Sequence, residues 1–356
     1  MAGPTFSTTA EAYPDGVTIR EVARRAGVSV ATVSRVLNNS GPASEAARHR
    51  IHAAAAELRY TPHGAARSLI TRKTRTLGVL LPDIYGDFFS EVIRGIDQAV
   101  RTHDHHLLVS GSHNDTAEIE AALQAMRGRV DGLIVMSPGI DAPALAANLP
   151  ENLPVVLLNC RPHGSSFDTL NIDNFAGAYA VTRHLVAVHG HRCVALIKGA
   201  ERNYDAQERL RGYRAALEES GAECSQSWEI AGDFTESAGY AAVAGILELK
   251  PRPTAIFAAN DAMAIGALSA LREAGMRVPE DLAIVGFDDI PITRYVSPPL
   301  TSIQVAISEL GTLAVEHLMR ASAAKNQHPR QQQILPTTLV VRRSCGCTPA
   351  ADPAGD

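Results

Sequence analysis

The sequence contains no long hydrophobic run, and no stretch approaches the roughly 20 apolar residues that a membrane span needs. Its first 16 residues hold neither a basic segment nor an apolar core, so no signal peptide is predicted. The five cysteines are scattered and odd in number, which is typical of a reducing compartment. We therefore expect a cytoplasmic protein that does not contact a membrane.

Motifs for cofactors and catalysis are also missing. There is no glycine-rich dinucleotide fingerprint, no phosphate-binding loop and no nucleophile elbow. The pair Cys345-Gly-Cys347 is too short for a zinc site and has no second pair, and the histidines at 103–106 and 189–191 fit solvated turns. We expect no cofactor, no metal, no enzymatic activity and a flexible, exposed tail over 344–356.

The charge is unevenly distributed along the chain. The net charge of -5 argues against binding to nucleic acid, but residues 17–75 hold eleven Lys/Arg and three Glu, a balance of +8. Residues 1–16 carry -2, which leaves -11 for the rest of the chain. A basic module attached to an acidic body is the electrostatic pattern of a DNA-binding head.

Residues 17–62 have the pattern of a helix-turn-helix domain, after an N-terminal extension (1–16) predicted to be disordered. Thr18 and Glu21 form a capping box, Gly27 permits the turn, and Ser29 caps a second helix. A third helix is predicted from Ser44 to about Leu58. The alternative is a small helical bundle with a solvated basic face. The residues expected to contact DNA are Thr18, Ser29, Val30, Ala31, Thr32, Ser34, Arg35 and Asn38.

Residues 63–75 are predicted to be a hinge. The Tyr60-Thr61-Pro62 segment ends the third helix, and the Ala-rich stretch that ends at Leu69 is only two turns long. So short a helix is marginal in water, so we expect it to be ordered only when docked. Arg67 and Leu69 are the predicted DNA-contacting residues here, and a plain interdomain linker is the alternative.

From Leu77 onward, short apolar runs alternate with amphipathic helical stretches, which predicts parallel sheets covered on both faces in a two-lobed α/β body. The runs are Leu77–Leu81, His106–Gly111, Gly132–Met136, Val155–Asn159, Cys193–Lys198, Ala255–Ala258 and Leu282–Gly286. In such sheets, ligands bind beyond the carboxyl ends of the strands.

Polar and aromatic residues follow these runs. Paired carboxylates, amides and an arginine suit vicinal hydroxyls, and aromatic rings stack on sugar faces, so a neutral polyhydroxylated ligand is predicted. Each residue also has a structural alternative, since Asp at such a turn often caps a helix and Phe-Phe often lies in a core. The predicted effector-binding residues are Asp83, Phe88, Phe89, Asn159, Arg209, Phe234, Asn260 and Asp288.

The segments Thr18–Leu69 and Thr76–Arg343 resemble the lactose/galactose repressor (LacI/GalR) family. The similarity rests on V-S-V-A-T-V-S-R-V (28–36), G-D-F-T-E-S-A-G-Y (232–240), A-N-D-A-M-A-I-G-A (259–267) and G-F-D-D-I-P-I-T-R-Y (286–295), and it favours the galactose-repressor branch. It implies a periplasmic-binding-protein-like body over 76–343. We expect lobe 1 at about 76–172 and 302–330, and lobe 2 at about 173–301 and 331–343.

The resemblance also implies what the residues do. Asn159, Arg209, Asn260 and Asp288 would contact sugar, Phe234 would be an aromatic platform, Phe88 or Phe89 would stack, and Leu69 would wedge into a palindromic operator from a homodimer. His63, Ile70 and Val305 depart from family members. The tail lacks heptad leucines, so no tetramerising coiled coil is expected.

The expected protein is thus a repressor of galactose-like sugar utilisation genes, released from double-stranded operator DNA by a monosaccharide or a derivative of one. A corepressor-dependent or activating regulator that responds to a non-sugar molecule stays open. A solute-binding protein is the alternative from another class.

Overall fold

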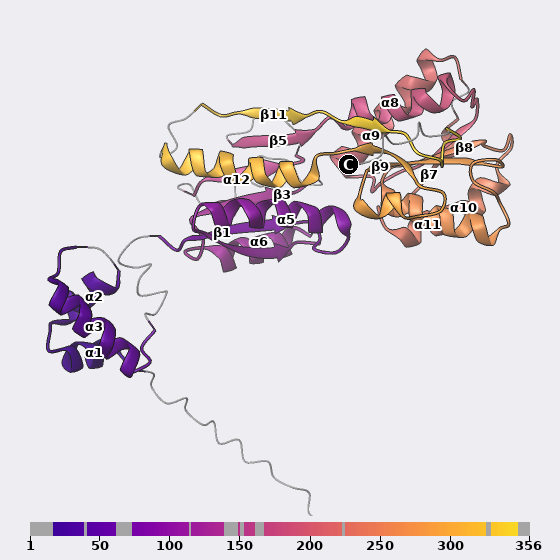
Figure 1. Ribbon diagram of the computed structural model, residues 1–356. Helices are drawn as coiled ribbons and strands as arrows, with labels where there is room; N and C mark the ends of the chain where they lie inside the picture. Colours follow the sequence, from indigo (N-terminus) through magenta and orange to yellow (C-terminus); the bar gives the residue numbers. More distant parts are fainter. Residues whose placement is uncertain are drawn as a thin grey trace, which may run out of the picture. The chain divides into compact units, whose positions relative to one another are not determined.

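The computed structural model describes residues 17–38, 41–61, 73–113, 115–138, 149, 153–160, 167–222, 225–324 and 329–347. The chain divides between Thr74 and Arg75 into a helical unit, the head, and a unit that contains the sheets, the body (Figure 1). The extension 1–16 and the hinge residues Arg67 and Leu69 lie outside the described residues. Within the described ranges, no helix is long and apolar enough to cross a membrane.

The head contains α1 (Ile19–Ala26), α2 (Val30–Leu37) and α3 (Glu45–Glu57). The Glu21 carboxylate accepts hydrogen bonds from the Thr18 amide (2.7 Å) and hydroxyl (3.1 Å), as the capping box predicts. Gly27 ends α1 at a φ of 65°, a left-handed conformation that glycine adopts without a Cβ penalty. The three predicted helices and their caps are confirmed.

A small apolar cluster holds these helices together. Val22, Val33 and Ile51, one from each helix, are completely buried, and Leu37 and Leu58 pack half-buried around them. An ion pair between Arg25 and Glu57 (2.7 Å) joins α1 to α3. The apolar spacing in the sequence therefore gives three helices around one core, with the outer face of α2 uncovered.

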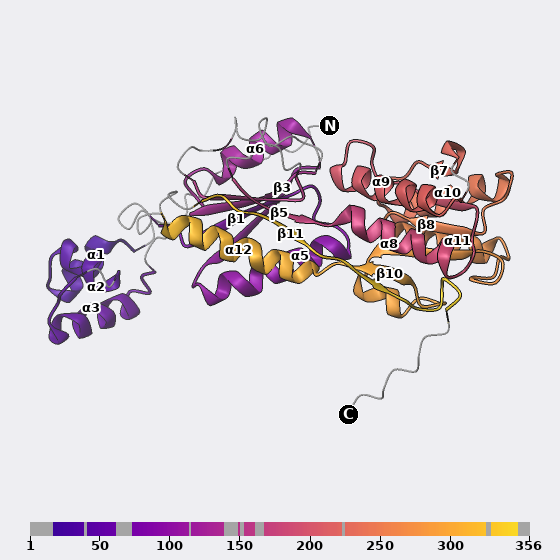
Figure 2. The ribbon, with the colours of Figure 1, turned by 90° about the horizontal axis from the view of Figure 1, so that it is seen from above.

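The first lobe of the body is built on a parallel sheet with strand order β11-β5-β4-β3-β1-β2. Helices α5 (Asp87–Thr102) and α12 (Ile307–Ala323) pack on one face, and α6 (Thr116–Met126) covers the other (Figure 2). The strands are β1 (Thr76–Leu81), β2 (His106–Gly111), β3 (Gly132–Met136), β4 (Val155–Leu158), β5 (Asp168–Ile172) and β11 (Gln332–Leu335).

The second lobe has strand order β12-β10-β9-β8-β6-β7, with only β12 antiparallel to its neighbour. Helices α8 (Asn174–Ala187) and α9 (Tyr204–Glu219) lie on one face, and α10 (Glu236–Glu248) and α11 (Asp261–Glu273) on the other (Figure 1). The strands are β6 (Val194–Ile197), β7 (Glu229–Ile230), β8 (Ala255–Ala258), β9 (Ala283–Asp288), β10 (Thr301–Gln304) and β12 (Thr338–Val340), and two 3-10 turns span Gln226–Trp228 and Pro291–Arg294.

The chain crosses between the lobes three times: from β5 to α8, from β10 to α12, and from β11 to β12. This corrects the expected division at two strands: 302–330, expected in lobe 1, begins with β10, and 331–343, expected in lobe 2, contains β11. β10 pairs with β9 in the second sheet, whereas β11 pairs with β5 in the first. The expected boundaries were wrong because strand pairing, which local sequence does not encode, decides the lobe.

The first residues of the expected flexible tail are in fact packed against the second lobe. Ser344 and Cys345 are 0% and 1% exposed. The Ser344 hydroxyl accepts a hydrogen bond from the Thr301 amide (2.8 Å) and donates one to the Ile284 carbonyl (2.6 Å). Residues 344–347 therefore belong to the body, and 348–356 lie outside the described residues.

Candidate functional site: an interlobe cavity and an exposed helix face

A cavity of about 650 Å³ lies between the two lobes of the body. Its wall is formed by the loop after β1 and the start of α5 in the first lobe, and by the carboxyl ends of β8 and β9 in the second. All eight predicted effector-binding residues lie on this wall: Asp83, Phe88, Phe89, Asn159, Arg209, Phe234, Asn260 and Asp288. The structure thus brings them together, while their role in binding stays a prediction.

Phe88 and Phe89 are on the first turn of α5, and their rings meet edge to face with centroids 5.5 Å apart. Asp83 lies in the loop before α5, where one carboxylate oxygen accepts hydrogen bonds from the amides of Ile84 (2.7 Å) and Tyr85 (2.9 Å). This Asp therefore shapes the loop through local turn chemistry and also presents a carboxylate to the cavity.

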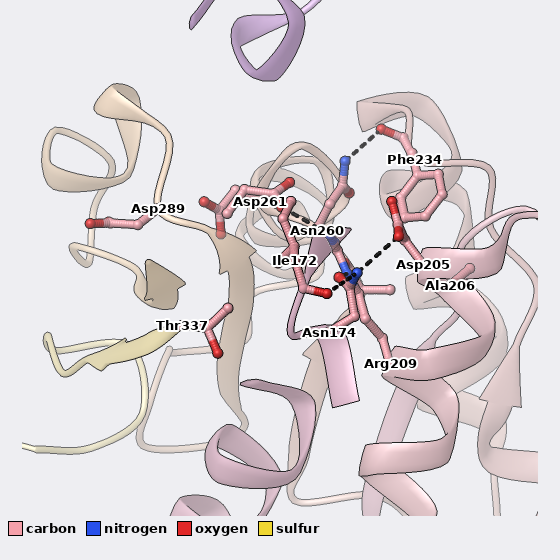
Figure 3. A network of polar contacts seen from close by, with 12 residues as sticks. Ile172, Asn174, Asp205, Ala206, Arg209, Phe234, Asn260, Asp261, Asp289 and Thr337 are labelled. Atoms are coloured by element: carbon pink, nitrogen blue, oxygen red, sulfur yellow. Dashed lines mark hydrogen bonds and ion pairs between the residues drawn. The ribbon is translucent and has the colours of Figure 1, made fainter. Parts of the chain in front are cut away.

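Arg209, on α9, is the centre of a buried polar network (Figure 3). Its guanidinium donates to Asn174 Oδ1 (2.7 Å), to the Ala259 carbonyl and to Asp288 Oδ1 (3.1 Å). The guanidinium also lies over the Phe287 ring, 3.7 Å from its centroid. With 4% of its surface exposed, Arg209 is held in one orientation by partners on several elements.

Two carboxyls beside Arg209 titrate far above their ordinary range. Burial raises the pKa of Asp205 to about 7 and that of Asp288 to about 6, although Arg209 lowers both. Hydrogen bonds from Asn159 and Asn174 also lower the pKa of Asp205. A single guanidinium thus compensates two buried acids only in part, and the cavity changes charge near neutral pH.

Sequence reasoning left Asn174 out of the site. Its amide donates to Asp205 (2.9 Å) and to the Ile172 carbonyl (3.2 Å), and its oxygen accepts from Arg209. Asn174 is the first residue of α8, directly after the first crossing between the lobes (Figure 3). The available signal was its place directly after a strand, but β5 was not among the predicted strands because its sequence, D-T-L-N-I, is largely polar.

Three of the predicted effector-binding residues have a strained backbone. Asn159, Phe234 and Asp288 have φ angles of 48°, 76° and 106°, which side chains with a Cβ rarely adopt. Such conformations cost roughly 1–3 kcal/mol each and cluster at binding sites. The buried Asn159 Oδ1 has no hydrogen-bond partner within the described residues, which leaves an acceptor for a ligand.

Asn260 lies on the cavity wall and also has a structural role. Its side chain caps α11 by accepting from the Met263 amide (3.0 Å), and it donates to the Phe234 carbonyl (3.0 Å; Figure 3). The ring of Phe234 packs on Gly199, where an added Cβ would come within 2.0 Å of it. Asn260 therefore fixes the loop that presents the aromatic ring.

In the head, the exposed face of α2 contains Val30, Ala31 and Arg35, with Ser29 at its start. Ser29 Oγ accepts from the Thr32 amide (3.1 Å) and contacts the Thr32 hydroxyl (2.8 Å), so both act in the cap. Ser34, half-buried, accepts from the Asn38 side chain (3.3 Å), and Thr18 is exposed. The exposed face of this short helix has small and polar side chains and one basic residue, and its N-terminal turn is open. A helix of this kind can enter the major groove of DNA.

Together, a helix-turn-helix head and a two-lobed body with an interlobe cavity define a DNA-binding transcriptional regulator that responds to a small molecule. Comparison with protein families supports both parts. Residues 18–63 match the family "Bacterial regulatory proteins, lacI family", and residues 182–345 match "Periplasmic binding protein-like domain".

Whole-chain relatives agree with these matches. The chain is 35% identical to the ribose operon repressor of Haemophilus influenzae over 328 residues, which covers 92% of this chain and 98% of the relative. It is 35% identical to the transcriptional repressor PurR of Photobacterium profundum over 329 residues, with coverage of 92% and 98%. The chain therefore belongs to the lacI family of bacterial regulatory proteins.

Solved structures show the same architecture. A Lac repressor dimer bound to operator and the anti-inducer ONPF superposes with a TM-score of 0.83 at 29% identity, covering 93% of this chain and 99% of that one. A lacI-family regulator from Enterococcus faecium with bound ribose gives a TM-score of 0.68 at 28% identity, covering 76% and 98%. The two-lobed body and the helical head are thus a family architecture.

Proposed function

We propose that this protein is a homodimeric repressor that releases a palindromic operator when a neutral monosaccharide binds between its lobes. The observation that carries the proposal is the composition of the cavity. Its wall combines aromatic rings with many carboxylates and a single arginine that is already engaged. We expect the sugar to resemble galactose or ribose. The sequence motifs favour galactose, and ribose is named in the descriptions of two similar proteins.

The charge of the wall favours a neutral polyol. Six carboxyl side chains line the cavity: Asp83, Asp87, Asp205, Asp233, Glu236 and Asp288. Among the described wall residues, Arg209 is the only Lys or Arg, and it is bound to Asp288 and Asn174. A phosphorylated ligand would meet net negative charge with no arginine to spare, whereas hydroxyl groups would donate to these oxygens.

The Asn159 Oδ1 atom, which has no hydrogen-bond partner among the described residues, and the strained backbone of Asn159 also favour a neutral polyol as the ligand. A sugar hydroxyl that donates to Asn159 Oδ1 would satisfy a buried acceptor, which otherwise costs about 1–3 kcal/mol. Phe88, Phe89 and Phe234 offer ring faces to the apolar side of a pyranose or furanose. A molecule with both hydroxyl groups and an apolar CH face would use both features.

Effector binding would change the affinity for DNA through the segments of the chain that cross between the lobes. Arg209 holds Asn174 at the first crossing, so a ligand that contacts Arg209 also acts on the strand that joins the lobes. A ligand that binds one relative lobe angle better shifts the population toward it. In this proposal the shift separates the two hinge segments of the dimer, withdraws Leu69 from the minor groove and lowers operator affinity.

The test of the effector is thermal denaturation of the full chain with a panel of ribose, galactose, glucose, a sugar phosphate and a free purine base. We expect one neutral monosaccharide to raise the melting temperature, because ligands that bind only the folded state stabilise it. A shift with the sugar phosphate or the purine base alone would contradict the sugar assignment and favour a non-sugar effector.

The test of regulation is a mobility shift on a palindromic operator with and without the stabilising sugar. We expect the sugar to weaken binding; stronger binding would instead indicate a corepressor. Arg35→Ala should cost about 1–3 kcal/mol of discrimination for its base pair, and Leu69→Ala should bind more weakly than the wild type. Light scattering then decides whether the DNA-bound species is a dimer.

A further inference from the structure

Two histidines and two cysteines meet at the end of the second lobe that is remote from the cavity. They are His184 near the end of α8, His189 in the following turn, and Cys345 and Cys347 in the segment after β12. Their nearest ligand atoms all lie within 4.8 Å of one another. The sequence pattern concealed this group, because about 160 residues separate the histidines from the cysteines.

We propose that these four residues form a structural site for a zinc-class divalent cation that fastens the C-terminal segment to α8. Two thiolates and two imidazoles are a complete ligand set for a closed tetrahedral zinc site. The inference does not depend on the proposed effector or operator. It replaces the expectation that Cys345-Gly-Cys347 lies in an exposed tail without chemistry.

The distances between the side chains suit a shared ion. Cys347 Sγ lies 3.2 Å from His189 Nε2 and 3.7 Å from His184 Nε2. In a tetrahedron with Zn–S of about 2.3 Å and Zn–N of about 2.0 Å, neighbouring ligand atoms are roughly 3.3–3.8 Å apart. The longest separation in the group exceeds this by about 1 Å, which side-chain rotation can close.

The backbone is shaped to present both sulfur atoms to the same place. Gly346, between the cysteines, has a φ of 100°, and a Cβ there would lie 3.3 Å from the His189 ring. Glycine therefore lets the turn bring Cys345 and Cys347 against the imidazole. The two histidine rings meet edge to face with centroids 5.0 Å apart.

The binding step exchanges water ligands for protein ligands. The hydrated cation loses its waters as two metal–sulfur and two metal–nitrogen bonds form, and the two thiol protons pass to solvent. The dication with two thiolates is neutral, so the half-buried site gains no net charge. No sugar-binding residue takes part.

The bound cation would hold the segment that follows the last crossing between the lobes against the end of α8. Residues 344–347 follow β12, the strand that returns from the first lobe, and Cys345 also accepts a hydrogen bond from the Thr301 hydroxyl (3.2 Å) on β10. On helix α8, His184 comes ten residues after Asn174, so the two lie about 15 Å apart along the helix axis. A bound cation would therefore stabilise the lobe without touching the effector.

The experiment is a titration of the reduced, chelator-treated full chain with Co²⁺, followed by displacement with Zn²⁺. We expect one cation per chain, with the visible bands of tetrahedral Co²⁺ and thiolate-to-metal charge transfer, and a Zn²⁺-dependent rise in melting temperature. Cys347→Ser and His189→Gln should each weaken binding by about tenfold or more. Mg²⁺ and Ca²⁺ should have no effect.

Two matched controls test the assignment. Cys193→Ser removes another thiol of the second lobe, and His191→Gln removes a neighbouring imidazole that instead contacts Thr254 (2.9 Å). Both should bind Co²⁺ like the wild type. A wild type that binds no Co²⁺, bands without thiolate charge transfer, or equal loss in the control variants would each overturn the proposal. Since His189 lies at the surface end of the group, its variant is expected to remain folded, as circular dichroism would verify.

Discussion

Replacing Arg209 by alanine should destabilise the second lobe far more at alkaline than at acidic pH. The guanidinium pairs with Asp288 (3.1 Å), lies beside Asp205 and donates to Asn174. All of these groups are buried. Arg209→Ala therefore leaves two buried carboxyls without the cation that opposes them.

Removal of one member of a buried ion pair costs about 3–5 kcal/mol, because the remaining charge is uncompensated. That cost depends on the carboxyls being ionised. Burial already raises their pKa to about 7 and about 6 against Arg209, so both pKa values rise further in the variant. An acid whose folded-state pKa is raised disfavours folding above that pKa, and the penalty is relieved as pH falls through it.

The difference in unfolding free energy between wild type and variant should therefore be about 3–5 kcal/mol near pH 8 and clearly smaller near pH 5.5. Urea unfolding followed by fluorescence measures it directly, since Trp228, the single tryptophan of the chain, is 1% exposed in the second lobe. This probe reports the lobe and does not depend on the head.

Arg211→Ala is the matched control on the same helix. Its guanidinium pairs with Glu208 and lies over the Phe175 ring, 4.8 Å from the centroid, with 64% of the arginine side chain exposed. Its loss should cost about 1 kcal/mol at either pH, because no buried acid depends on it for charge compensation. A cost for Arg209→Ala as small as this, or one that does not change with pH, would refute the picture of a cation that compensates two buried acids.

Three further predictions concern packing, capping and binding. Gly266→Ala should lower the free energy of unfolding by about 3 kcal/mol or more in the same urea assay, because the added Cβ would lie 1.9 Å from the Glu236 carbonyl oxygen. Gly245→Ala on α10 is its control: nothing lies within 4 Å of the added Cβ, so this variant should be more stable by roughly 0.5–1 kcal/mol. Ser29→Ala should cost the head about 1 kcal/mol, seen by circular dichroism, because the cap to the Thr32 amide is lost. The affinity for the proposed sugar, measured by calorimetry, should fall as the pH is lowered from about 8 to about 5.5. Asp205 and Asp288, with pKa values of about 7 and about 6, lose acceptor capacity when they are protonated. An affinity that does not change with pH would mean that these two acids do not contact the ligand.

Local sequence was sufficient for the head and for most strands. Caps, a turn glycine and helical spacing are short-range signals. The three helices α1, α2 and α3 begin directly after Thr18, Ser29 and Ser44, and α1 ends at Gly27, as the sequence indicates. All seven apolar runs form strands. The position of residues after these strands also predicted the cavity wall, because parallel strands place their carboxyl ends at one edge.

The strands that were missed are short or contain polar residues. β5 reads D-T-L-N-I and is fully buried, with the Asp168 carboxylate accepting from the Gln331 amide (3.0 Å) beside β11. Burial of polar residues is tolerated only when partners from elsewhere satisfy them, and an apolar pattern cannot reveal such partners. Asn174 was overlooked for the same reason, since it follows β5.

The sequence by itself thus determined the elements, the basic head on an acidic body, and the chemical character of the cavity, because these depend on residue type and near neighbours. Only the tertiary structure decided which lobe β10 and β11 join, how Arg209 is shared between Asp288 and Asn174, and that His184 and His189 meet Cys345 and Cys347. These depend on strand pairing and on contacts between residues that lie from 35 to more than 150 positions apart in the sequence. Such contacts are set by how the whole chain packs, which no local pattern records.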